Sequence, residues 1–123
     1  MNKNVIKIYT NSSDWARTMM FLKSSAFTGT ALEIPLANDK DKGISITVKI
    51  AKLKDYASSS IYIRKIEQDP DIASFTKETT KSIAFLGDPV KCKDGFETLI
   101  MENRGLICKA LRDLSGEEWE IKF

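Results

Sequence analysis

The stretch ISITVKI, residues 44–50, decides the fold class of this chain. Its apolar and polar residues alternate strictly, in the order Ile44, Ser45, Ile46, Thr47, Val48, Lys49 and Ile50. A period of two is typical of a strand that buries one face and exposes the other to water. The alternation slips near Ala51, where we expect a bulge that turns Leu53 inward.

Shorter segments on both sides also have strand character. Residues 30–36 place three apolar side chains on one face, and Pro35 has no backbone N–H to donate, which indicates an edge strand. A polar loop over 38–43 separates this segment from the strand at 44–50, and a loop over 54–60 leads to a short strand at 61–64. Further strands are expected over 5–10 and 119–123.

Two helices are predicted with well-marked starts. The first follows Ser12 or Ser13, either of which can cap it, and its apolar stripe consists of Trp15, Met19, Leu22 and Ala26. The second spans about 70–86, with Pro70 at its first position and Gly87 as its stop. Its predicted apolar stripe consists of Ile72, Phe75, Ile83 and Leu86.

Residues 96–114 are open to two interpretations. As a helix, with Asp94 and Glu97 as an approximate capping box, the segment has one apolar face comprising Phe96, Leu99, Ile100, Leu106, Ile107, Ala110, Leu111 and Leu114. As a hairpin, it turns at 102–105, but neither arm alternates. A helix must accommodate Gly105, at a cost of about 1 kcal/mol relative to alanine. The helix is the favoured interpretation.

Together these segments predict an α+β fold in the order βαβββααβ. We expect a single antiparallel or mixed sheet of about five strands with two to three helices on one face, and a more β-rich second half if the hairpin forms. The 123 residues contain no repeat or linker, so residues 1–123 are expected to form a single globular domain.

The sequence contains no histidine, which removes most familiar catalytic and metal-binding arrangements. Glycine-rich phosphate loops are also missing, so we expect no metal and no cofactor. What remains for an enzyme is carboxylate chemistry around Glu117, Glu118 and Glu120, or a nucleophilic Cys108. This small enzyme is the second alternative below, and the chain is more simply interpreted as non-enzymatic.

The location expected from the sequence is the cytoplasm. The first residues show no signal-peptide pattern, and no apolar run reaches the length that a membrane span requires. Cys92 and Cys108 are therefore expected to be reduced thiols.

Four consecutive apolar residues, 19–22, suggest a binding surface on the first helix. They cover about 300° of a helix, so one core cannot hold them all. We expect an exposed patch of Met20, Phe21 and Lys23, and a substitution of Phe21 by Glu that leaves folding intact. The leading hypothesis is therefore a small non-enzymatic protein that binds a macromolecular partner, most simply another protein, as inhibitors, immunity proteins and antagonists of host defence do. The oligomeric state stays open.

The alternative hypothesis is a module that binds single-stranded DNA or RNA. The solvated sheet face would combine aromatic and basic side chains, which stack on bases and neutralise phosphates. The candidate residues are Lys7, Tyr9, Lys49, Tyr62 and Arg64. Glu33, Glu118 and Glu120 are expected to dilute this surface if they share it.

Overall fold

The computed structural model describes residues 3–9, 12–53, 57–68, 71–72, 75–85 and 96–123. Its elements, in chain order, are β1 (Asn4–Lys7), α1 (Ser12–Lys23), a short 3-10 turn η1 (Ser25–Phe27), β2 (Ala31–Asp39), β3 (Ile44–Lys52), β4 (Ala57–Gln68), β5 (Thr76–Phe85), α2 (Phe96–Glu102), α3 (Arg104–Ser115) and β6 (Trp119–Lys122). The α+β class predicted from the sequence is confirmed.

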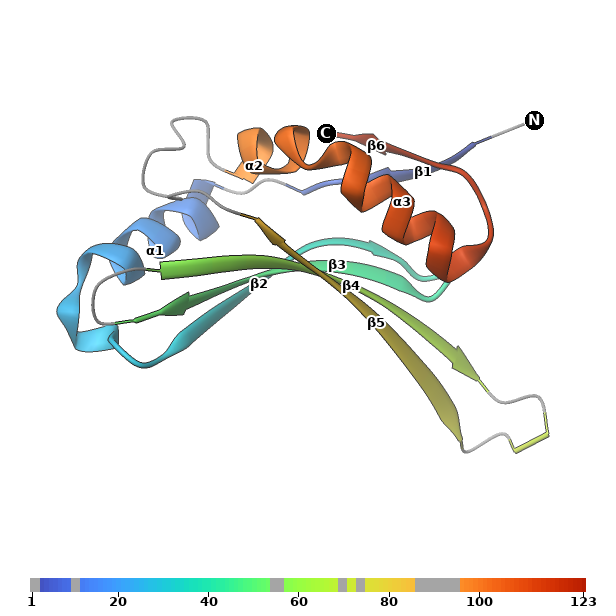
Figure 1. The fold of residues 1–123 in the computed structure, drawn as a ribbon, viewed down its shortest axis with the longest axis horizontal. Coiled ribbons are helices and arrows are strands. Elements are labelled where there is room, and N and C mark those ends of the chain that lie inside the picture. Colours follow the sequence, from blue (N-terminus) through green and yellow to red (C-terminus); the bar gives the residue numbers. More distant parts are fainter. Residues whose placement is uncertain (1–2, 10–11, 54–56, 69–70, 73–74, 86–95) are drawn as a thin grey trace.

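The strands form two sheets. Strands β2, β3, β4 and β5 make an antiparallel sheet in that order, and β1 pairs in parallel with β6 in a second, two-stranded sheet. The three helices and the β1–β6 pair all lie over one face of the four-stranded sheet (Figure 1). The expected placement of helices on one face is therefore confirmed, and the terminal strands join the helical layer instead of extending the main sheet.

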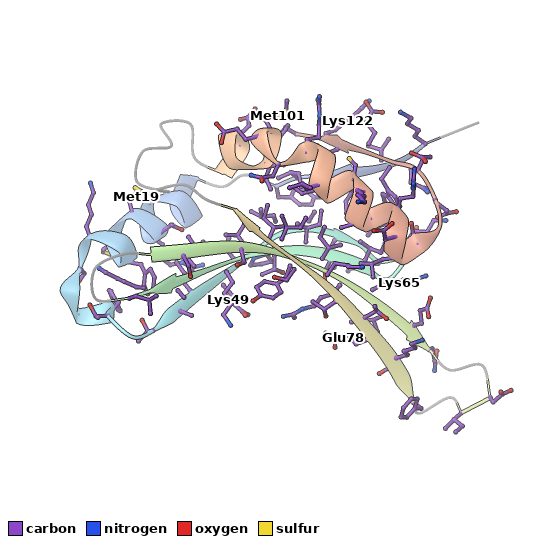
Figure 2. The ribbon with its side chains drawn as sticks, viewed as in Figure 1. Met19, Lys49, Lys65, Glu78, Met101 and Lys122 are labelled. Carbon is purple, nitrogen blue, oxygen red and sulfur yellow. The ribbon has the colours of Figure 1, made fainter. Side chains whose placement is uncertain are left out.

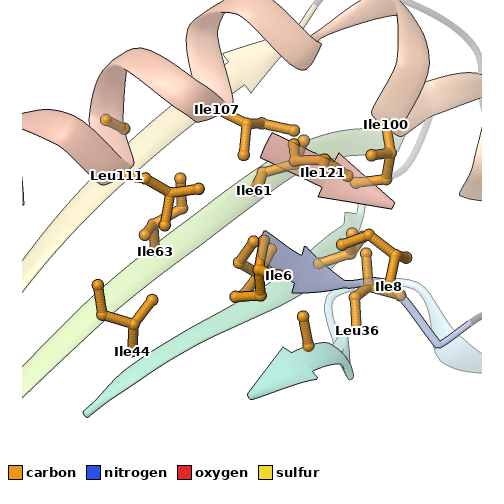
Figure 3. Close-up of a cluster of buried hydrophobic side chains, with 14 of the residues drawn as sticks. Ile6, Ile8, Leu36, Ile44, Ile61, Ile63, Ile100, Ile107, Leu111 and Ile121 are labelled. Atoms are coloured by element: carbon orange, nitrogen blue, oxygen red, sulfur yellow. The ribbon is translucent and has the colours of Figure 1, made fainter. Parts of the chain in front are cut away.

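The hydrophobic core lies between these two layers. Ile6 and Ile121 reach it from the two-stranded sheet, Ile107 and Leu111 from α3, and the main sheet supplies its inward-facing side chains (Figure 3). Six apolar inward residues of β3 and β4 are fully buried, and they are Ile44, Ile46, Val48, Ile50, Ile61 and Ile63. This is the alternation that the sequence predicts for 44–50.

Strand β2 lies at one edge of the sheet, as Pro35 predicts. The bulge was expected near Ala51, but β3 pairs regularly with β4 through Lys52 and the register shifts in β2, between Pro35 and Ala37. Leu53 is consequently 39% exposed and does not turn inward. Proline disturbs a ladder because it lacks a donor, which accounts for the irregularity beside Pro35.

The helix predicted over 70–86 is wrong, because residues 76–85 form β5. This segment pairs with β4 along its whole length, from Thr76 opposite Gln68 to Phe85 opposite Ser59. Its threonines are poor helix formers but suit a pleated sheet, so pairing with β4 outweighs the helix-start signal. Ile72 and Phe75, expected on a buried stripe, are 57% and 58% exposed. Leu86 and Gly87 lie outside the described residues.

The helical interpretation of 96–114 is confirmed, with a break at Asn103 that divides it into α2 and α3. The break places Gly105 in the first turn of α3, where it interrupts no long helix. Leu106 was expected on the buried face but is 54% exposed, because the buried stripe of α3 comprises Ile107, Ala110 and Leu111. Asp94, the proposed cap, lies outside the described residues.

The tip of the β2–β3 hairpin depends on one glycine. Gly43 has a φ of 68°, and a Cβ there would collide with the backbone oxygen of Ile66. The close approach allows the Ile66 N–H to donate to the Gly43 carbonyl at 2.8 Å. Glycine is therefore required at this position by both conformation and space.

Within the described part of the chain, no helix is long and apolar enough to span a membrane.

Candidate functional site

The face of the main sheet that points away from the helices is the candidate site. Figure 2 shows Lys49 and Glu78 on this side. Strand alternation places the other members, and we use the name outer sheet surface for Glu33, Ser45, Thr47, Lys49, Ser60, Tyr62, Arg64, Glu78, Thr80 and Ser82. No described helix or strand covers it. These members are polar and rich in hydroxyl groups, and Pro35 and the 51% exposed Ile66 share the face with them.

Its centre is a contact between a cation and an aromatic ring. Lys49 Nζ lies 5.9 Å from the centre of the Tyr62 ring. Thr47 is the register partner of Tyr62 and Ser60 is that of Lys49, so the contact runs diagonally between β3 and β4. Both neighbours are small, and Lys49 and Tyr62 are each half-buried on this face.

The second cation of the surface is Arg64, the register partner of Ser45. Its Nε lies 3.7 Å from Oε1 of Glu78, and the side chains of this pair are 38% and 54% exposed. An ion pair between side chains this exposed contributes little to stability. Little free energy is therefore lost if Arg64 leaves Glu78 and pairs with another anion. Glu33 stands opposite Lys49 on β2, so acidic groups flank both cations.

The structure brings together three of the five residues predicted for nucleic-acid binding. Lys49, Tyr62 and Arg64 share the outer sheet surface, but Lys7 and Tyr9 come from β1 and the residues after it, over the opposite face. The N–H of Tyr9 donates to the Leu36 carbonyl at 2.8 Å, and its side chain is 61% exposed. Their placement follows from the separate β1–β6 sheet, which the sequence pattern does not reveal.

Two of the three acidic residues expected to weaken the positive charge of this surface do not lie on it. Glu118 and Glu120 belong to β6 or its approach and lie over the helix-bearing face. Glu33 does lie on the outer sheet surface, and Glu78 joins it from β5. Sequence reasoning missed Glu78, Thr80 and Ser82 because it assigned their segment to a helix; the density of β-branched residues over 76–83 is the signal that could have found them.

The patch predicted on α1 needs a correction. Phe21 is only 7% exposed and belongs to the core, where its ring centre lies 5.4 Å from that of Phe27. Met20 is 64% exposed and Lys23 is also exposed. The inward positions are Thr18 and Phe21, three residues apart. Four consecutive apolar residues do not reveal which of them faces inward. Of the stripe expected along Trp15, Met19, Leu22 and Ala26, Met19 is half-buried and Ala26 is exposed, and the side chains of Trp15 and Leu22 lie outside those described.

Lys52, on β3, holds the C-terminal end of α1 in the rotation that turns Phe21 inward. Its Nζ donates to the Phe21 carbonyl at 3.0 Å and to the Ser24 carbonyl, at the C-terminal end of α1. Carbonyl groups there have no partner within the helix, and a cation stabilises that end of the helix dipole. The two bonds hold the end of α1 against the last residue of β3 and keep Phe21 turned inward.

Two of the carboxylates considered for catalysis are held by neighbouring polar groups, and the third, Glu120, is exposed on β6. Glu117 accepts from Asn4 Nδ2 at 3.1 Å and pairs with Lys42 Nζ at 3.0 Å, and Arg112 lies 3.4 Å from Glu118. The half-buried Cys108 lines a shallow hollow of about 310 Å³ beside α3 and Glu118. Burial raises the pKa of this thiol above its ordinary value of 9.0, although Arg104 and Lys3 act in the opposite direction. A raised pKa is unfavourable for a nucleophile.

Metal ligands do not cluster in the described ranges: no group of three or more Cys, Asp or Glu side chains there could hold an ion. Cys92 lies outside these ranges.

Comparison with known proteins places the chain in no family. No protein-family description, curated protein or solved structure matches it.

Proposed function

We propose that this chain is a non-enzymatic binding protein that takes single-stranded nucleic acid on its outer sheet surface. The observation that carries the proposal is the contact of Lys49 with the Tyr62 ring, 5.9 Å from cation to ring centre, on an open sheet face. The half-buried Tyr62 ring would offer a base a stacking platform, and a neighbouring cation would neutralise the adjacent phosphate.

The surroundings of this contact support the same partner. Arg64 lies two residues from Tyr62 on the same face of β4, so that cations stand on two sides of the ring. Hydroxyl groups from three strands surround it, and they belong to Ser45, Thr47, Ser60, Thr80 and Ser82. Hydroxyl side chains donate to phosphate and sugar oxygens without selecting a sequence. The proposal is therefore binding with little sequence preference.

The charges define how strong and how salt-sensitive this binding should be. Two cations, Lys49 and Arg64, contact phosphates, and Glu33 and Glu78 reduce the attraction. With about two phosphate contacts on a single strand, log affinity should fall with log salt with a slope of about −1.4. Binding is accordingly expected to be weak and best seen at low salt.

Fluorescence anisotropy with a labelled oligodeoxythymidine and a labelled oligouridine tests the proposal. We expect both to bind at low salt with the shallow slope given above. A long DNA duplex is the control, because all of its bases except the terminal pairs are stacked on both faces and cannot stack on Tyr62. Equal affinity for the duplex, or no binding of either single strand at low salt, contradicts the proposal.

A protein partner docked on α1 is the second candidate function. The observation that favours it is Met20, whose side chain is 64% exposed, with Lys23 also exposed on the same helix. Inhibition, immunity or antagonism of a host protein would be activities of this kind. The test is capture of a stoichiometric protein from nuclease-treated lysate by the wild-type chain, lost on the double substitution Met20→Glu and Lys23→Glu. Capture that is unchanged in this variant contradicts a role for α1.

A further inference from the structure

The two edges of the main sheet differ in how far they are protected. The β2 edge contains Pro35 and a bulge, and the Tyr9 N–H already occupies the Leu36 carbonyl. At the other edge, β5 pairs with β4 along one side and with no other described strand. Every second residue of an edge strand directs its N–H and C=O away from the sheet. Among the described residues, the ten-residue strand β5 is therefore the edge without a second partner strand.

The side chains along β5 make this edge basic on one face. Lys77 and Lys81 lie on the helix-bearing side, opposite Glu67 and Ile63, and both are exposed. Glu67 is already held by Lys65, whose Nζ is 2.5 Å from its Oε1. That pairing, through its hydrogen bond and charge, lowers the pKa of Glu67. Lys77 therefore shares Glu67 with Lys65, and Lys81 faces the apolar residue Ile63.

These lysines decide which strand could add to the edge. A second copy of β5 paired antiparallel about Thr79 would place Lys77 opposite the Lys81 of the other copy, and like charges directly opposite are unfavourable. A strand with acidic residues at alternate positions would instead meet both ammonium groups. Its other face would lie beside Glu78, Thr80 and Ser82, where neutral hydroxyl side chains fit best.

We propose that β5 binds an extended acidic segment of a partner protein as a fifth strand of the main sheet. The main-chain hydrogen bonds of β5 provide attraction to any strand, and Lys77 and Lys81 select for acidic side chains. This edge adjoins the outer sheet surface through Glu78, Thr80 and Ser82, whereas Lys49 and Tyr62 lie farther in, on β3 and β4.

The test uses the full chain and a synthetic peptide of alternating Glu and Thr residues. In NMR titrations we expect the peptide to shift the amides of β5 and to protect every second one from hydrogen exchange. The double substitution Lys77→Glu and Lys81→Glu should weaken binding by about tenfold or more. The double substitution Lys40→Glu and Lys122→Glu makes the same change in net charge at two exposed positions outside both proposed sites and should leave peptide binding unchanged.

A second test uses only the wild-type chain, so it does not depend on whether a variant folds. Here a peptide of alternating Lys and Thr residues replaces the acidic peptide. The proposal requires that it binds at least about tenfold more weakly than the acidic peptide. Equal binding of the two peptides, shifts that lie outside β5, or a dimer that uses β5 and excludes the acidic peptide would each overturn it. Oligonucleotide binding is measured separately. A negative result with the peptides therefore does not bear on nucleic-acid binding by the outer sheet surface.

Discussion

Lys49 Nζ lies 5.9 Å from the centre of the Tyr62 ring, across neighbouring strands on the face of the main sheet that no described element covers. The contact depends on the register of β3 against β4, because a shift by one residue would send either side chain into the core. The buried side chains of the same strands hold that register. The hydrophobic core thus positions the proposed binding surface on its far side.

Removal of the Tyr62 ring should weaken binding of a single strand. We expect Tyr62→Ala to reduce affinity for oligodeoxythymidine by about tenfold to a hundredfold, since stacking on an aromatic side chain is worth about 1–3 kcal/mol per base. Tyr9→Ala is the matched control, because Tyr9 is 61% exposed but lies outside the outer sheet surface. Anisotropy titrations measure both. Equal losses in the two variants would argue against stacking on Tyr62.

The ion pair between Arg64 and Glu78 should restrain binding. We expect Glu78→Gln to raise affinity by a few-fold, because it removes a carboxylate 3.7 Å from the arginine Nε. Arg64→Gln should lower affinity and reduce the salt slope by about 0.7, the loss of one phosphate contact. Affinity titrations at several salt concentrations separate the two effects. A Glu78→Gln variant that binds more weakly would show that the carboxylate itself contacts the ligand.

Substitution of Phe21 should unfold or strongly destabilise the chain. Phe21 is 7% exposed and packs on Phe27, so Phe21→Ala should cost about 3–5 kcal/mol of unfolding free energy. Phe21→Glu should be worse, because it buries a charge. Met20→Glu, at the next position, should change stability by less than about 0.5 kcal/mol. Urea denaturation gives these values, and a stable Phe21→Glu variant would show that Phe21 is not core.

The thiol of Cys108 should lose its proton at a higher pH than a free cysteine does. Burial raises its pKa above the ordinary value of 9.0, so the thiol stays protonated and unreactive at neutral pH. In a Cys92→Ser background, the rate of alkylation by iodoacetamide should rise with pH with a midpoint above 9.0 in the folded chain and near 9.0 in denaturant. A folded-state midpoint below the denatured one would instead indicate an activated thiol and reopen the enzymatic alternative.

Periodicity predicted the parts of the fold that local pattern determines. The alternation at 44–50 gave β3 and its buried face, Pro35 gave the edge position of β2, and the apolar face of 96–114 gave a helical segment. Strand β5 was missed because a helix-start signal precedes residues whose strand state depends on pairing with β4. The β-branched residues over 76–83 are the only local sign of this strand named above, and the helix-start signal was given more weight.

The candidate site was also predicted only where its residues lie on strands with a clear alternation. Lys49, Tyr62 and Arg64 came from strands with clear alternation, so their shared face could be predicted. Lys7 and Tyr9 were misplaced because β1 pairs in parallel with β6 at the other end of the chain. Phe21 was misplaced because a run of four apolar residues in a helix has no unique phase, and the bonds from Lys52 that fix it come from β3.

An NMR titration of the labelled full-length chain with oligodeoxythymidine at low salt tests the central claim most directly. We expect shifts concentrated at Thr47, Lys49, Tyr62 and Arg64, with the amides around Met20 and Lys23 unchanged. Shifts that gather on α1 or on the β1–β6 pair, or no shifts at low salt, would contradict the assignment of nucleic-acid binding to the outer sheet surface.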